Sequence, residues 1–171
     1  DVERSRGLGD VYKRQGKSSV GRQLGKVMQT PFTDTDKIIE ERAGKKIAEI
    51  FLEDGEPIFR EIEREVVLAE IAKEDGILAL GGGSILDSEV DKELSKLKSR
   101  VIYLEVSISN AAPRVGFNKD RPLLAVNPRQ QWMALMEKRR PIYERLAGHK
   151  VSTDNKKPSE VVKEIQGLIG K

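Results

Sequence analysis

Residues 77–83 read ILALGGG, so four apolar residues run directly into three glycines. A short apolar run that ends at turn formers is typical of a strand buried on both faces of a parallel sheet. Three glycines remove every side chain, which lets backbone amides approach a ligand closely. A simple turn seldom needs three, so we interpret Gly81, Gly82 and Gly83 as part of a binding site.

Helical and apolar segments alternate on both sides of this stretch. Apolar spacing predicts helices over residues 16–29, 56–73, 88–98, 129–146 and 158–169. Short apolar runs predict further strands over residues 31–34, 101–106 and 150–153. This alternation predicts an α/β fold, with a parallel sheet covered by helices on both faces. Ligands in such folds bind at the carboxyl ends of the strands, where residues 34–36 and 81–83 fall.

Three of the predicted helices carry more specific expectations. In the helix of residues 56–73, the buried stripe is expected to consist of four apolar residues, Ile58, Ile62, Val66 and Ala69. Ser88 is the expected N-cap of the helix of residues 88–98. Pro141 is expected to interrupt or kink the helix of residues 129–146.

Composition narrows the class of protein. The chain has 171 residues, a length that suits one domain, and a net charge of +3 from 31 basic and 28 acidic residues. Because the two signs are interspersed, a nucleic-acid-binding role is not expected. The chain has no cysteine for a disulfide or a thiolate metal site. Its apolar runs are too short to span a bilayer and its N-terminus lacks a signal-peptide core, so we expect a cytoplasmic protein.

A phosphate-binding pattern opens the first predicted helix, at Gly16-Lys17-Ser18. In a phosphate-binding loop, backbone amides at a helix N-terminus surround the phosphates, while the lysine neutralises them and the hydroxyl ligates Mg²⁺. The full pattern needs a glycine five positions before Gly16, and Val11 stands there. On the tripeptide alone, an ordinary helix start is therefore the favoured interpretation.

Two carboxylates follow the strand of residues 31–34, in the sequence Asp34-Thr35-Asp36. As the chain leaves the sheet, one carboxylate can face a metal and the other a substrate hydroxyl. The competing interpretation is a helix N-cap, which is the commoner role of an aspartate here. Both can hold together, with Thr35 or Asp36 as the capping residue.

Four arginines, Arg60, Arg114, Arg121 and Arg139, are uninformative one by one, since a solvated arginine is the usual case. Arg121 stands out because it lies in the loop-like segment of residues 113–126, which carries several turn formers. A mobile lid that carries a cation is what phosphoryl transfer requires.

Taken together, these residues resemble the shikimate kinase family. The matching segments occur in family order over residues 16–171: residues 16–21 (GKSSVG), 32–36 (FTDTD), 47–51, 55–56, 59–63 (FREIE), 80–83 (LGGG), 101–105, 121–124 (RPLL) and 138–143. Each segment alone is weak evidence for the family, whereas the whole set in this order is specific to it. The resemblance implies a P-loop NTPase architecture of three layers, like that of nucleoside-monophosphate kinases, and transfer of the γ-phosphoryl of ATP to the 3-hydroxyl of shikimate.

For the nucleotide side, the resemblance implies that Gly16, Lys17, Ser18 and Ser19 bind the ATP phosphates. It implies that Ser18 and Asp34 hold Mg²⁺. Arg121 would reach the phosphates from a lid over residues 113–126, and Arg114 and Asn155 would lie near the adenine. The family often has arginine after position 155, where this chain has lysines.

For the substrate side, the resemblance implies that Asp36 binds the shikimate hydroxyls and accepts the reacting proton. Arg60 and Arg139 would bind the carboxylate, and the glycines of residues 81–83 would present their backbone to the substrate. The catalytic set is therefore expected to be Lys17, Asp34, Asp36 and Arg121. The substrate-binding region is expected over residues 34–62 of a single kinase domain, residues 16–171, acting as a monomer.

Residues 1–15 (DVERSRGLGDVYKRQ) do not match the family, which normally begins with an apolar strand and a glycine-rich loop. We interpret them as a foreign segment, a sequencing artefact that stands in place of that strand. On this interpretation, the chain is expected to have low stability and weak or no activity. Two other functions stay open: a gluconate kinase-like small-molecule kinase, and an inactive nucleotide-binding module.

Overall fold

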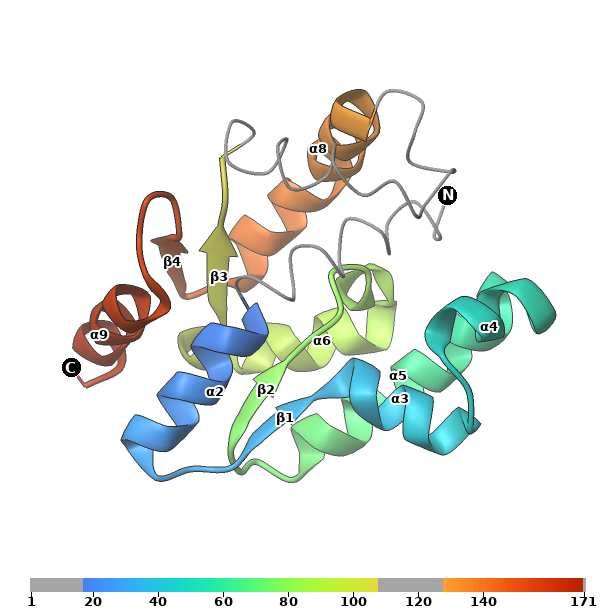
Figure 1. The fold of residues 1–171 in the computed structure, drawn as a ribbon, viewed down its shortest axis with the longest axis horizontal. Helices are drawn as coiled ribbons and strands as arrows, with labels where there is room; N and C mark the ends of the chain where they lie inside the picture. Colours follow the sequence, from blue (N-terminus) through green and yellow to red (C-terminus); the bar gives the residue numbers. More distant parts are fainter. Residues whose placement is uncertain (1–16, 108–127, 171) are drawn as a thin grey trace.

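The computed structural model describes residues 17–107 and 128–170 and has the expected alternation of helices and strands (Figure 1). The α-helices are α2 (Lys17–Met28), α3 (Thr35–Ala43), α4 (Ile47–Glu53), α5 (Glu56–Ala72), α6 (Ser88–Lys96), α8 (Pro128–Leu146) and α9 (Pro158–Ile169). The strands are β1 (Phe32–Asp34), β2 (Ile77–Ala79), β3 (Ile102–Glu105) and β4 (His149–Ser152). Two short 3-10 helices are η1 (Ser84–Leu86) and η2 (Lys98–Arg100).

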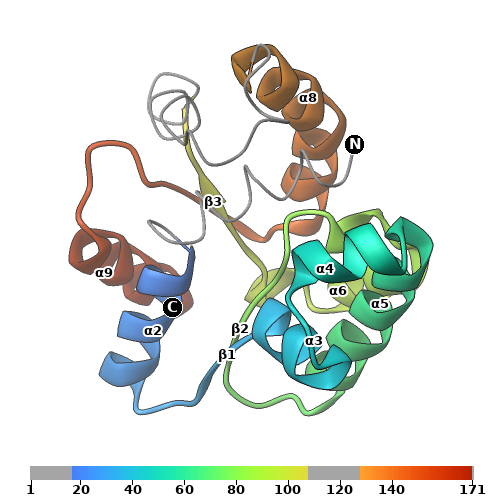
Figure 2. The same cartoon turned by 45° about the vertical axis from the view of Figure 1, so that its right-hand side comes forward.

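The strands pair in parallel, as the sequence predicts. Strand β1 lies beside β2, with Phe32 opposite Ile77, and β3 lies beside β4, with Ile102 opposite His149. Within residues 17–107 and 128–170, these pairs form two separate two-stranded sheets. Helices α2 and α9 lie on one side of the strands, and α3 to α6 lie on the other (Figure 2). The α/β class with both faces covered is therefore confirmed.

Among the residues that the structure describes, three hydrophobic clusters hold these layers together. The first joins α2, β4 and α9 and includes Leu24, Val151 and Val161. The second lies among α3, α4 and α5 around Ile39 and Ile50, and the third joins α5, α6 and α8. Because β1 and β2 lie between α2 and the other helices, the clusters fix the sheet edge where the carboxylates and glycines emerge.

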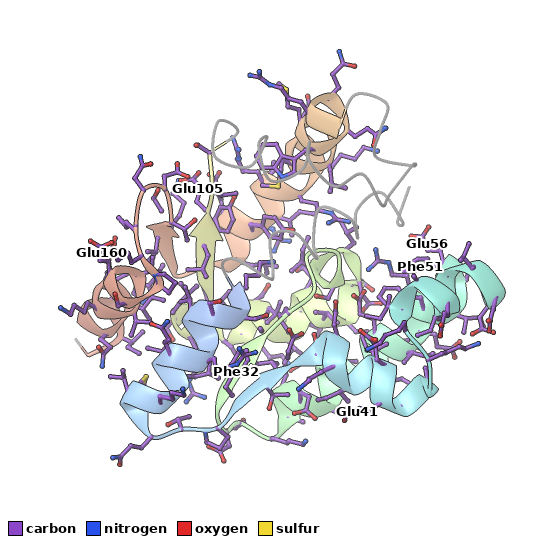
Figure 3. All side chains as sticks on the ribbon, in the orientation of Figure 1. Phe32, Glu41, Phe51, Glu56, Glu105 and Glu160 are labelled. Carbon is purple, nitrogen blue, oxygen red and sulfur yellow. The ribbon has the colours of Figure 1, made fainter. Side chains whose placement is uncertain are left out.

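The buried stripe of α5 differs from the expected one. Ile58 is 44% exposed, whereas Phe59, Glu63 and Val66 are buried. Phe59 packs on Phe51 of α4, with ring centroids 4.5 Å apart (Figure 3 labels Phe51). Apolar residues lie around much of this helix, so the choice of the inner face depends on tertiary contacts that periodicity alone does not contain.

The structure also bears on two further local expectations, and the expected N-cap of α6 is wrong. Ser88 is the first helical residue of α6, and Asp87 is the N-cap, accepting hydrogen bonds from the amides of Glu89 and Val90 at 2.9 and 3.1 Å. The carboxylate of Asp87 suits the positive end of the helix dipole. Helix α8 runs through Pro141 without the interruption that was one of the two expected outcomes, and the expected kink stays a prediction.

Candidate active site

A hydrogen bond joins the carboxyl ends of β1 and β2, and a second bond closes the turn after β2. The buried Thr35 hydroxyl donates to the carbonyl oxygen of Ala79 at 3.2 Å, which joins the start of α3 to the end of β2. The Ser84 amide donates to the carbonyl oxygen of Gly81 at 3.1 Å and closes the turn of residues 81–83. These bonds bring the Asp34–Asp36 segment and the glycine turn to one place.

Asp34 is the N-cap of α3 and also contacts the start of α2. One of its carboxylate oxygens accepts a hydrogen bond from the Asp36 amide at 3.0 Å, so Asp34 caps the helix instead of Thr35 or Asp36. Its other oxygen accepts a hydrogen bond from the Ser18 hydroxyl at 3.1 Å. The residues expected to hold Mg²⁺ are thus adjacent.

Each glycine of residues 81–83 faces a different charged group. A Cβ at position 81 would lie 3.1 Å from Asp36 Oδ1 and 3.1 Å from Glu63 Oε2. At position 82, a Cβ would lie 3.3 Å from Arg139 Nη1 and 4.0 Å from Lys17 Nζ. At position 83, it would lie 2.6 Å from Arg60 Nη2. A side chain at any of these positions would push against cations or carboxylates from four helices.

Arg60 lies on α5 and is held by two carboxylates of the same helix. Its Nη1 forms an ion pair with the buried Glu63, three residues further on. Its Nε lies 3.6 Å from Glu56 Oε1, one turn earlier (Figure 3 labels Glu56). A surface arginine would extend its guanidinium into bulk water. These two carboxylates instead keep the Arg60 guanidinium beside Gly83.

Arg139 lies on α8 and is only 5% exposed. Burial lowers the pKa of its guanidinium from the usual value, and the nearby Arg60 adds to that decrease. Tyr143, one turn further along α8, opposes the effect. An arginine stays protonated even so. A buried cation that gains from a negative neighbour is suited to binding an anion.

Charge is therefore divided across the glycine turn. Two carboxylates, of Asp36 and Glu63, lie beside Gly81, and the cations of Arg139, Lys17 and Arg60 lie beside Gly82 and Gly83. A ligand that spans the turn meets hydrogen-bond acceptors at one end and guanidinium donors at the other. This arrangement suits a small molecule with hydroxyl groups at one end and a carboxylate at the other.

The Ser18–Asp34 pair fits Mg²⁺ in the presence of phosphate groups. Mg²⁺ takes oxygen ligands and is usually held by one or two protein groups together with phosphates and water. The hydroxyl of Ser18 and the carboxylate of Asp34 supply that number of oxygens, 3.1 Å apart. In the part of the chain that the structure describes, no group of three or more acidic, histidine or cysteine residues could hold a metal without such help.

The remaining predicted site residues divide into two groups. Ser19 lies in the first turn of α2, and Asn155 lies in an exposed turn after β4 with a φ of 56°. Neither is among the residues that surround Gly82. Gly16, Arg114, Arg121 and the expected lid of residues 113–126 lie outside the described residues.

Two residues of this site were missed by the sequence analysis. Glu63 is buried in the apolar face of α5, and its signal is a carboxylate three residues after Arg60 on the same face as Phe59. Tyr143 donates from its hydroxyl to the carbonyl oxygen of Gly82 at 2.6 Å. Its signals are its place in the family-like segment of residues 138–143 and its position four residues after Arg139, which places both on one helix face.

A parallel α/β fold, a lysine at a helix N-terminus and a charged glycine turn beside it define a small-molecule kinase of the P-loop class. The family model for shikimate kinase matches residues 15–169 of this chain. The chain belongs to the shikimate kinase family.

Individual relatives agree with this assignment. The chain is 48% identical over 151 residues to a shikimate kinase of Rhodococcus jostii, covering 88% of this chain and 89% of that protein. It is 47% identical over 146 residues to one of Streptomyces coelicolor, covering 85% and 84% of the two chains.

A solved structure of Acinetobacter baumannii shikimate kinase in complex with shikimate matches with a TM-score of 0.79 and 31% identity, over 95% of this chain and 87% of that one. The Aquifex aeolicus shikimate kinase structure matches with a TM-score of 0.76 and 35% identity, over 91% of this chain and 90% of that one. The fold of the described residues is thus that of its family.

Proposed function

We propose that this protein transfers the γ-phosphoryl group of ATP to the 3-hydroxyl of shikimate, giving shikimate 3-phosphate and ADP. Family membership supports the reaction type, and the curated relatives are shikimate kinases. The observation that carries the substrate assignment is the division of charge across residues 81–83. Shikimate has a carboxylate at one end and three hydroxyls at the other, which complements that division.

On the substrate side, the carboxylate of shikimate binds Arg60 and Arg139. A planar guanidinium offers two parallel donors to a carboxylate, and two guanidiniums fix the orientation of the ring. The ion pair with Glu63 keeps Arg60 from swinging into solvent. The hydroxyl end then lies towards Gly81 and the carboxylate of Asp36, which binds the hydroxyls and accepts the proton of the attacking one.

On the nucleotide side, Lys17 and the amides at the start of α2 bind the phosphates of ATP. Ser19, in the same turn, adds a donor. Arg121 is proposed to stabilise transition-state charge, and Arg114 and Asn155 to lie near the adenine. Because Lys17 and Arg139 both lie beside Gly82, the phosphates and the shikimate ring meet at one point of the backbone. Phosphoryl transfer depends on such positioning and charge stabilisation more than on covalent chemistry.

Ser18 and Asp34 would hold Mg²⁺ beside the phosphates, where the ion neutralises charge on the transferred group. Asp34 would therefore serve two purposes, as N-cap of α3 and as metal ligand. We also propose that the protein acts as a monomer in the cytoplasm. Within the described residues, no helix is both long and apolar enough to cross a membrane.

A substrate panel tests this function. The purified protein is incubated with Mg²⁺-ATP and either shikimate or gluconate, and the products are followed by phosphorus NMR and by ADP release. We expect a new phosphate ester with shikimate only, formed slowly, because residues 1–15 do not match the strand and glycine-rich loop with which the family begins. Phosphorylation of gluconate instead would support the gluconate kinase-like alternative. Binding of ATP and shikimate without any ester would support the inactive nucleotide-binding module.

A further inference from the structure

Two carbonyl oxygens of the glycine turn are held by hydroxyl groups of the protein. The Gly81 carbonyl accepts from both the hydroxyl and the backbone amide of the buried Ser84, so both of its lone pairs are occupied. The Gly82 carbonyl accepts from the Tyr143 hydroxyl at 2.6 Å. The direction of these two carbonyls is therefore set by side chains from outside the turn.

The direction of each carbonyl fixes the direction of the amide that follows it. A peptide unit is planar and trans, so the N–H of one residue points opposite to the C=O of the residue before it. The bonds from Ser84 to the Gly81 carbonyl therefore turn the Gly82 amide away from Ser84. In the same way, the bond from Tyr143 to the Gly82 carbonyl turns the Gly83 amide away from Tyr143.

The amides of Gly82 and Gly83 have no acceptor within residues 17–107 and 128–170. Gly83 is buried, and a buried amide without a partner costs free energy comparable to that of a lost hydrogen bond. The carbonyl of the same residue does have a partner, the Leu86 amide at 3.1 Å. The turn thus directs its acceptors into the protein and leaves two donors for an oxygen of a ligand.

A peptide unit between two glycines needs such anchors to keep one orientation. Glycine adopts positive and negative φ with similar ease, so this peptide can rotate and exchange the positions of its N–H and its C=O. The surroundings of the turn make the exchange costly for an anion. A Cβ at position 82 would lie 3.3 Å from Arg139 Nη1 and 4.0 Å from Lys17 Nζ, so an anion is expected here, and a carbonyl dipole would repel it.

We propose that Ser84 and Tyr143 are positioning residues that hold the amides of Gly82 and Gly83 towards the substrate carboxylate. Each hydroxyl acts through one peptide plane. The turn therefore binds a group that only accepts hydrogen bonds and discriminates against a group that also donates them. The identity of the ligand rests on the proposed function, whereas the orientation of the two amides does not.

Residual dipolar couplings of the ligand-free protein test the orientation, because they report the direction of each N–H bond in solution. Ser84→Ala removes the hydroxyl and keeps the backbone bond to Gly81. We expect it to change the coupling of the Gly82 amide, through averaging over a second orientation. Tyr143→Phe should instead change the coupling of the Gly83 amide. Wild-type couplings at both amides in both variants would overturn the proposal.

Each variant has a matched control in the same chain. Ser95→Ala removes a hydroxyl that also donates to a backbone carbonyl, that of Asp91 at 2.8 Å, on the exposed face of α6. Tyr103→Phe removes the hydroxyl of the ring that stacks on Tyr143, with centroids 5.1 Å apart. Both controls should leave the couplings of the glycine turn as in the wild type. If Ser84→Ala does not fold, Tyr143→Phe tests the same claim at the next peptide unit.

Ligand selectivity tests what the two amides do. Calorimetric titration compares shikimate with its neutral carboxamide analogue, whose amide group both accepts and donates hydrogen bonds. Ser84→Ala and Tyr143→Phe should each weaken shikimate binding about tenfold and carboxamide binding by less than about threefold, so the preference for the carboxylate falls. Equal losses for the two compounds would mean that the hydroxyls act through packing alone, which contradicts the proposal.

The two measurements also separate this proposal from the proposed function. A wild-type protein that binds neither compound and forms no phosphate ester would refute the assignment of shikimate as the substrate. The dipolar couplings of Gly82 and Gly83 would still decide whether Ser84 and Tyr143 orient the amides, because they are recorded without a ligand.

Discussion

The Tyr143 hydroxyl donates to the carbonyl oxygen of Gly82 at 2.6 Å, and this bond ties α8 to the glycine turn. Because Arg139 lies one turn away on the same helix, the bond also sets the distance between that guanidinium and the turn. Tyr143→Phe should weaken shikimate binding about tenfold and lower the free energy of unfolding by about 1–2 kcal/mol. Calorimetric titration with shikimate and with ATP measures the effect, and ATP affinity should change little.

Tyr103→Phe is the matched control for that variant. The Tyr103 ring stacks on Tyr143 with centroids 5.1 Å apart, and the substitution leaves the bond to Gly82 in place. It should therefore keep wild-type shikimate affinity. Equal losses in the two variants would show that the aromatic pair acts through packing alone.

Arg139→Lys should weaken shikimate binding by about 10–100-fold, since a lysine keeps the charge but loses the two-donor fit to a carboxylate. Arg145→Lys on the same helix is the control, because Arg145 forms an exposed ion pair with Asp91 away from the glycine turn. That variant should bind shikimate as the wild type does. A normal affinity for the Arg139 variant would remove this residue from the carboxylate site.

Gly83→Ala should separate binding from stability. The added Cβ would meet the end of the flexible Arg60 side chain, which can move aside at little cost to folding. Displacement of that guanidinium should reduce shikimate affinity about tenfold while the unfolding midpoint stays close to wild type.

Gly167→Ala is the counterpart for that experiment. A Cβ at position 167 has no neighbour within 4 Å, and the residue lies inside α9. The substitution should stabilise the protein by about 0.5–1 kcal/mol without any change in shikimate binding. Thermal unfolding and titration of both variants make the comparison.

Asp34 offers a way to separate capping from metal binding. Asn is as good an N-cap as Asp, so Asp34→Asn should preserve the unfolding midpoint. Loss of the charge should raise the Mg²⁺ concentration for half-maximal activity about tenfold. Asp34→Ala should show the same metal defect and also lose about 1 kcal/mol of stability. An unchanged Mg²⁺ requirement in both variants would exclude Asp34 as a ligand.

Two tyrosines, one buried and one partly buried, predict a loss of stability at high pH. Burial raises the pKa of the Tyr103 and Tyr143 hydroxyls above the ordinary value of 10.0. The folded state therefore keeps these protons when the unfolded chain releases them, so their contribution to stability is full below about pH 10 and is lost as the pH rises further. Denaturant unfolding of the wild type should show a steeper fall above about pH 10 than the Tyr103→Phe, Tyr143→Phe double variant.

The strands and most helices could be predicted because short apolar runs and helical spacing are local signals. Helices α3 and α4 were missed. They lie in a stretch rich in charge, and Gly44, in the left-handed region at φ 69°, separates them. The Asp87 and Asp34 caps were displaced by one or two residues in the prediction, since neighbouring Ser, Thr and Asp side chains are nearly equivalent as caps until the backbone is known.

The site residues could be predicted only together, from the ordered series of family-like segments, and not one by one. Nothing in the sequence around Arg60 or Arg139 distinguishes either from a surface arginine. The two lie near each other only because α5 and α8, which are far apart in sequence, both reach the glycine turn. Glu63 had a readable signal, a carboxylate within an apolar helix face. The Tyr143 bond to Gly82 spans 61 residues of sequence, so no local pattern contains it.

The bare backbone of residues 81–83 has a consequence for inhibitor resistance. Every single substitution at a glycine adds atoms, and here the added Cβ meets Asp36, Arg139 or Arg60, the groups proposed to bind substrate. A compound that binds through this backbone therefore faces few escape mutations, because those that displace the compound also displace shikimate.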